Sequence, residues 1–141
     1  MTFFKDLTTF EYFQDARRPE LQQALNVGWL SALKYYPLGL TSHAFRHKLR
    51  DLCAKPQLQT RGYHPCYLGL CKLIPRSLCA VGSGIVIVRG AKDFFAAPEL
   101  IYHYVRWHWY RPPRAFIDAV LATMPTGSLR SRFSISRLTS A

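Results

Sequence analysis

Two apolar runs joined by a short polar segment occupy residues 84–97. The first run, 84–89, is rich in Val and Ile and is too short for a typical helix. The four residues 90–93, Gly-Ala-Lys-Asp, suit a turn, after which residues 94–97 would return as a second strand. The unbroken apolar character is typical of strands that are covered on both faces. The pattern therefore predicts a buried β-hairpin.

Three other segments have the apolar spacing of amphipathic helices. The clearest is 43–54, where Thr41 and Ser42 can accept hydrogen bonds from the free amides of the first turn and Pro56 ends the helix. A second helix is predicted at 98–109, since Pro98 suits a first helical turn. A third is predicted at 113–122.

These elements predict an α+β fold in one domain. The chain has 141 residues, of which 49% are hydrophobic, enough to bury a core without disulfides or metal. We expect a small antiparallel sheet that contains the 84–97 hairpin and packs against about three helices, 43–54, 98–109 and 113–122. We assign residues 1–125 to the globular domain and expect the Ser- and Arg-rich residues 126–141 to form a flexible basic tail.

The segment 55–79 has no regular apolar pattern. It is interrupted five times by proline or glycine, at Pro56, Gly62, Pro65, Gly69 and Pro75. We therefore predict a long irregular loop. Such loops in compact domains usually carry function or are held in place by another group.

Metal-ligand residues gather in this loop. His64, Cys66 and Cys71 lie within eight positions, and zinc binds both thiolate sulfur and imidazole nitrogen. In an extended chain the side chains of His64 and Cys66 point to the same side. The sequence therefore makes His64, Cys66, Cys71 and Cys79 the candidate ligands of a zinc site. Other candidates for the fourth ligand are Cys53, His103 and His108.

Three other interpretations of these residues remain open. The thiols can pack as small apolar groups, form a redox pair, or supply Cys66 as a nucleophile beside a distant histidine. His103 and His108 lie five positions apart, a poor spacing for one helical face. Since His108 falls on the apolar stripe of its predicted helix, the pattern favours a core histidine there.

The basic charge of the chain is uneven. The net charge is +11, and residues 41–76 contain seven Lys and Arg against Asp51 alone, a net of +6. Such a surface favours nucleic acid or an acidic protein as partner, although it also suits plain solubility. A mixture of arginines and aromatic side chains suits phosphate contact and base stacking. The candidate nucleic-acid-binding residues are Arg46, Arg50, Arg61, Arg106 and Arg111.

No segment of the sequence suggests export or membrane insertion. The first residues are not followed by a long apolar stretch, and the most apolar run, 80–88, is too short to span a bilayer. The four cysteines are irregularly spaced and do not indicate a secreted disulfide framework. We therefore expect a cytoplasmic protein without a transmembrane segment.

Three motifs follow one another along the chain. They are NVGWL at 26–30, RGYHPC at 61–66 followed by Cys71, and AAPELIYHYV from residue 96, which continues through His108 and Pro112-Pro113 to Ile117. From about residue 5 to residue 122 the chain resembles a family of small uncharacterised bacterial proteins. The resemblance implies a bacterial cytoplasmic protein and no established activity. In relatives the cysteine of the second motif is usually followed by another as Cys-x-x-Cys, whereas here four residues intervene.

The sequence favours a non-enzymatic binding or interaction protein with a structural zinc site. A nucleic-acid-binding protein is the alternative, and an enzyme with Cys66 as nucleophile is third. No Gly-x-Ser-x-Gly, His-Glu-x-x-His or paired-carboxylate motif is present, which argues against the common hydrolases.

Overall fold

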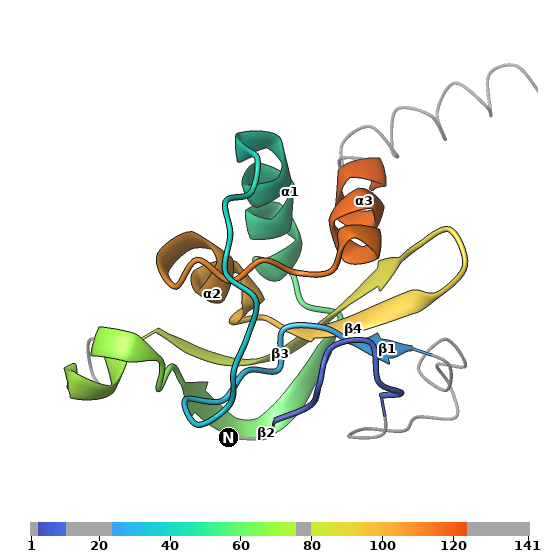
Figure 1. Cartoon of the computed structure of the whole chain (residues 1–141). Coiled ribbons are helices and arrows are strands. Elements are labelled where there is room, and N and C mark those ends of the chain that lie inside the picture. The colour runs from blue at the N-terminus through green and yellow to red at the C-terminus, as the bar shows by residue number, and fades with distance from the viewer. Residues whose placement is uncertain (1–2, 11–23, 76–79, 124–141) are drawn as a thin grey trace, which may run out of the picture.

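A computed structural model describes residues 3–10, 24–75 and 80–123, and it confirms the α+β fold (Figure 1). Four strands form one sheet in the order β1-β4-β3-β2, and the three α-helices lie on one face of it. The strands are β1 (Leu25–Asn26), β2 (Leu58–Pro65), β3 (Val81–Arg89) and β4 (Phe94–Pro98). The helices are α1 (His43–Cys53), α2 (Ile101–Trp107) and α3 (Arg114–Ala122), with a short 3-10 helix η2 (Gly69–Leu73).

The predicted hairpin is confirmed as β3 and β4. The two strands are antiparallel, with Val86 opposite Ala97 and Val88 opposite Phe95. Val86 and Val88 belong to the main core below the helices, whereas Ile85 belongs to a second core on the other face. Both faces are therefore covered, as the unbroken apolar run predicted. The sheet is antiparallel except for β1, which pairs parallel to β4.

The prediction of an irregular loop over residues 55–79 is wrong. Residues 58–65 form β2, an edge strand paired antiparallel with β3, and η2 follows. The pairing shifts register between Gln59 and His64. That irregularity accommodates Gly62, and Pro65 lies at the end of the strand, where the missing amide is tolerated. The glycines and prolines mark a distorted edge strand.

Helix α1 was predicted correctly, and of the two cap candidates, Thr41 and Ser42, it is Ser42 that caps it. The hydroxyl of Ser42 accepts a hydrogen bond from the amide of Phe45 at 3.1 Å. Phe45 is fully buried, and its ring packs edge-on against Phe116 of α3 with centroids 6.3 Å apart. Phe116 in turn packs edge-on against Phe95 of β4 at 5.8 Å. These rings join two helices to the sheet.

The predicted bounds of the second helix are wrong at both ends. Pro98 is the last residue of β4, where it pairs with Ile85, so the helix begins only at Ile101. The helix ends at Trp107, two residues earlier than predicted. The third helix begins at Arg114 and ends at Ala122, close to the predicted 113–122.

Asp6 holds the N-terminal segment against the body of the domain. One carboxylate oxygen accepts a hydrogen bond from the Gly28 amide at 3.1 Å, and the other accepts one from the hydroxyl of buried Tyr110 at 2.7 Å. Burial raises the pKa of Asp6, while the hydrogen bonds from Tyr110 and Gly28 oppose the rise.

Two other expectations concern a flexible C-terminal tail and the absence of a transmembrane segment. The predicted tail, 126–141, lies outside the described residues. No helix among the residues that are described is long and apolar enough to cross a bilayer.

Candidate metal centre

Two cysteines and two histidines converge where β2 and η2 meet α2. They are Cys66, Cys71, His103 and His108, and their ligand atoms all lie within 4.8 Å of one another. Cys66 is buried and the other three are partly exposed. Residues that are distant in the chain thus meet at one point.

The backbone around η2 fixes the two cysteines. Cys66 directly follows β2, and its amide donates to the carbonyl of Ala80 at 2.9 Å, which ties it to the start of β3. The amide of Cys71 donates to the carbonyl of Leu68 at 3.0 Å. Between them Gly69 has a φ of +51°, a left-handed conformation that favours glycine. This tight turn presents both sulfurs to α2.

The end of α2 brings the two histidines together. On a continuous helix, residues five apart are rotated by about 140° around the axis, so their side chains diverge. Here the helix ends at Trp107, and His108 has a φ of −118°. Trp109 then adopts a left-handed φ of +59°. The chain leaves the helix axis, and the Nε2 atoms of His103 and His108 lie only 3.2 Å apart.

The distances fit a tetrahedral zinc ion. A tetrahedral ion with Zn–S of about 2.3 Å and Zn–N of about 2.0 Å separates sulfur from nitrogen by about 3.5 Å and two nitrogens by about 3.3 Å. The Sγ of Cys66 lies 3.3 Å from His108 Nε2. The Sγ of Cys71 lies 3.4 Å from His103 Nε2 and 3.3 Å from His108 Nε2. Four of the six distances between donor atoms are therefore close to those that one zinc ion imposes, and all six are within 4.8 Å.

Hydrogen bonds alone do not account for this arrangement. His108 Nε2 lies within 3.3 Å of three other donor atoms, those of Cys66, Cys71 and His103. An imidazole nitrogen has either one N–H or one lone pair in the ring plane, so it serves one partner well. A cation at the centre of the four atoms satisfies all of them at once.

The protonation states also suit metal binding. Burial, with a smaller effect from His108, lowers the pKa of His103 to about 4. Burial also lowers the pKa of His108. Both imidazoles are therefore neutral near pH 7, which is the form that binds a metal. The amide of Leu68 lies 3.5 Å from the Cys66 sulfur, as a donor that favours the thiolate.

The cluster contains two of the four residues in the predicted zinc site. Cys66 and Cys71 are brought together, and the other two members, His103 and His108, were alternatives for the fourth ligand. The His64 side chain and Cys79 lie outside the described residues, so their part in a site stays a prediction. Cys53 lies in the last turn of α1, outside the cluster, and burial raises the pKa of its thiol to about 12.

A spacing signal for the histidines was present in the sequence. Four residues separate Cys66 from Cys71, and four separate His103 from His108. Structural zinc sites commonly use pairs with two to four residues between cysteines and three to five between histidines. The interpretation of His103 and His108 as too poorly spaced to meet assumed that the helix continued through His108, whereas it ends before it.

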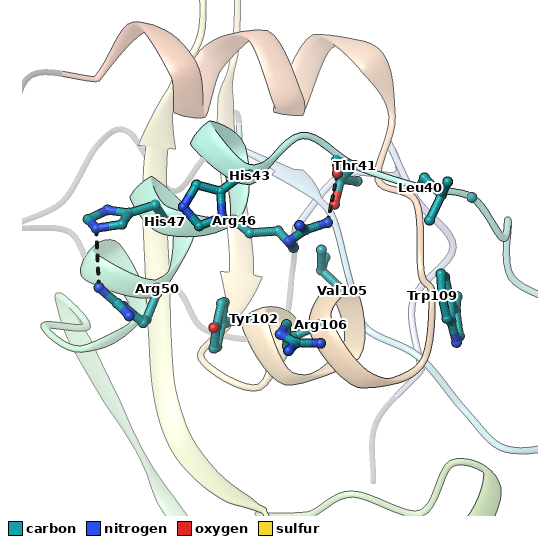
Figure 2. Close-up of a pocket in the computed structure, with 11 residues that line it drawn as sticks. Leu40, Thr41, His43, Arg46, His47, Arg50, Tyr102, Val105, Arg106 and Trp109 are labelled. Atoms are coloured by element: carbon teal, nitrogen blue, oxygen red, sulfur yellow. Dashed lines mark hydrogen bonds between the residues drawn. The ribbon is translucent and has the colours of Figure 1, made fainter.

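Three of the five candidate nucleic-acid-binding arginines meet at a different place. Arg46 and Arg50 of α1 and Arg106 of α2 line one pocket (Figure 2). Arg111 lies beside it, since a Cβ built on the pocket residue Gly39 would come within 2.8 Å of the Arg111 side chain. Arg61 belongs to β2, and its side chain lies outside the described part of the chain.

Comparison with known proteins identifies the family and no activity. Residues 2–121 match the family described as a domain of unknown function (DUF7919), so the chain belongs to that family. No curated protein and no solved structure matches the chain. The expectation of an uncharacterised family is confirmed at this level.

Proposed function

We propose that this domain binds one zinc ion through Cys66, Cys71, His103 and His108, and that the ion is structural. The observation that carries the proposal is the convergence of four donor atoms, with four of their six distances near those of a tetrahedral zinc site. Four protein ligands complete the coordination shell of zinc, whereas catalytic sites keep one position open for water or substrate. Two thiolates and two neutral imidazoles also balance the +2 charge of the ion.

The position of the cluster indicates what the ion would do. It would join the end of β2, the helix η2 and both ends of α2. Cys71 is the η2 residue that packs, partly buried, against the main core, whereas Leu70 is 77% exposed and Leu73 is 73% exposed. Apolar packing therefore contributes little to holding this segment. A zinc ion would supply the missing attachment, since metal binding contributes directly to folding.

A closed site supports a non-enzymatic role. With all four positions taken by protein side chains, the ion has no place for a substrate or an activated water. This favours a binding or interaction domain whose surface is held in shape by zinc. It argues against Cys66 as a free nucleophile, because its sulfur would be a ligand.

The test is zinc content in the purified full-length chain, prepared without a metal-affinity tag. We expect about one zinc per chain, lost in Cys66→Ser, Cys71→Ser, His103→Gln and His108→Gln. Cys53→Ser is the matched cysteine control and should keep its zinc. Metal-free wild-type protein, or full retention of zinc in the His103→Gln and His108→Gln variants, would overturn the proposal.

Two further variants separate this ligand set from the candidate set named from the sequence. His64→Gln and Cys79→Ser should keep about one zinc per chain. Loss of zinc in either of them, together with retention in His103→Gln, would instead support the set His64, Cys66, Cys71 and Cys79.

A further inference from the structure

A basic pocket lies between α1 and α2, apart from the candidate metal centre. Its volume is about 480 Å³, within the range of sites that hold small ligands. Tyr102, Val105 and Arg106 of α2 line it. His103 and His108 belong to the metal cluster, so α2 offers one side to each site. The pocket and the cluster share no residue.

The pocket combines several cations with no carboxylate. Arg46, Arg50 and Arg106 line it together with the imidazoles of His43 and His47, and no Asp or Glu is among the described residues that do so. A concave surface with charge of one sign concentrates its field and attracts the opposite charge. The pocket is therefore suited to an anion.

The arginines of the pocket differ in whether a carboxylate of the protein lies close enough to offset their charge. The Nε of Arg50 lies 3.9 Å from a carboxylate oxygen of Asp51. Arg46 and Arg106 form no ion pair within the described parts of the chain. The Nη1 of Arg46 donates to the carbonyl of Thr41 at 2.7 Å, which fixes the guanidinium at the pocket wall and leaves its other donors available. Guanidinium groups match phosphate oxygens with paired hydrogen bonds.

An exposed aromatic ring lies at one end of the same pocket. Trp109 is 60% exposed and lines the pocket near Leu40, as Figure 2 shows. Its left-handed φ of +59° is rare for a bulky side chain, and burial of the ring does not explain it. An exposed indole beside arginines offers a flat surface on which a nucleobase can stack.

We propose that this pocket binds a nucleotide unit, with its phosphate on Arg46 and Arg106 and its base against Trp109. The same chemistry is offered by a free mononucleotide and by one unit of a single-stranded nucleic acid. The recognition would be insensitive to sequence, because stacking and phosphate contact read no base edge.

The experiment measures binding of three probes to the zinc-replete full-length chain at low salt. The probes are inorganic phosphate, adenosine monophosphate and a short fluorescent single-stranded oligonucleotide. Arg46→Gln and Arg106→Gln should each weaken nucleotide binding by about ten- to a hundredfold, as expected for lost charged hydrogen bonds. Arg114→Gln, on α3 and outside the pocket, is the matched charge control and should bind like wild type.

Trp109→Gly tests the aromatic contact without introducing backbone strain, because glycine adopts a positive φ freely. It should weaken the two nucleotide probes and leave phosphate binding unchanged. Zinc content and the thermal midpoint are measured for every variant. A variant that matches the wild type in both has an intact fold and metal site, so a loss of nucleotide binding then reports on the pocket alone.

The two nucleotide probes distinguish the source of the ligand. Binding of the monophosphate with no gain for the oligonucleotide supports a free nucleotide. Tighter oligonucleotide binding, with the same sensitivity to Arg46→Gln and Arg106→Gln and a steep fall with salt, supports nucleic acid. The proposal is overturned if neither nucleotide probe binds. It is also overturned if Arg114→Gln weakens binding as much as the pocket variants, or if Trp109→Gly has no effect on the nucleotides.

Discussion

Removing zinc should open η2 and the end of α2 while leaving the hairpin closed. Ordering the five residues of η2 costs about 5–10 kcal/mol in backbone entropy alone. None of those residues is fully buried and Cys71 alone of them packs against the main core, so burial offsets little of this cost. Binding to structural zinc sites is worth about 10–16 kcal/mol, which is enough to hold the segment.

Native-state hydrogen exchange measures this directly. In the structure the amides of Cys71 and Ile74 donate to the carbonyls of Leu68 and Cys71 at 3.0 and 3.2 Å, and zinc should hold these bonds closed. If zinc removal costs η2 even 5 kcal/mol, these amides lose protection by about a thousandfold or more, because 1.4 kcal/mol is a factor of ten. The amides of β3 and β4, within the buried ladder, should change far less.

A variant provides the control for the chelator. Cys66→Ser without chelator should reproduce the exchange pattern of the chelated wild type, and Cys53→Ser should match the untreated protein. Unchanged exchange in η2 after confirmed zinc loss would refute the argument that metal holds this segment. An equal rise in η2 and in the hairpin would show that the ion supports the whole fold and not one segment.

Two further predictions concern the core and the N-terminal anchor. Phe116→Ala should lower the free energy of unfolding by about 3–5 kcal/mol in urea denaturation, because it removes a buried ring packed against aromatic rings of α1 and β4. Phe116→Leu should cost less, and an equal loss in both variants would contradict the packing argument. Because burial raises the pKa of Asp6, its contribution to stability is present below the unfolded value of 3.8 and is lost as pH rises through the folded pKa. Asp6→Asn keeps an acceptor for Tyr110, so relative to wild type it should gain stability between acidic and neutral pH; a relative loss over that range would be inconsistent with the buried charge.

Local sequence signals were sufficient for part of the fold. The hairpin follows from two apolar runs on either side of a turn, the first of them β-branched, and α1 follows from the cap candidates Thr41 and Ser42 and an apolar stripe. Strand β2 was missed because its main support is non-local: it pairs with β3, about twenty residues later in the chain. Gly62 and Pro65 indicate a loop only as long as that pairing is unknown.

The candidate metal centre, like the fold, could be predicted from the sequence only in part. The Cys66 and Cys71 pair could be predicted from its spacing in the sequence. The histidine pair depends on where α2 stops. Glycine usually occupies the left-handed position after a helix, whereas here Trp109 does. The stop signal in the sequence, Arg111-Pro112-Pro113, lies beyond His108, so His103 and His108 were assigned to one continuous helix on which they cannot meet.

X-ray absorption at the zinc edge of the purified full-length protein tests the proposed metal site most directly. The ligand set Cys66, Cys71, His103 and His108 predicts two sulfur neighbours at about 2.3 Å and two nitrogen neighbours at about 2.0 Å, with the outer-shell scattering of two imidazole rings. The set with His64 and Cys79 instead predicts three sulfurs and one nitrogen. A three-sulfur shell, a shell completed by water, or protein without zinc would contradict the proposed structural site.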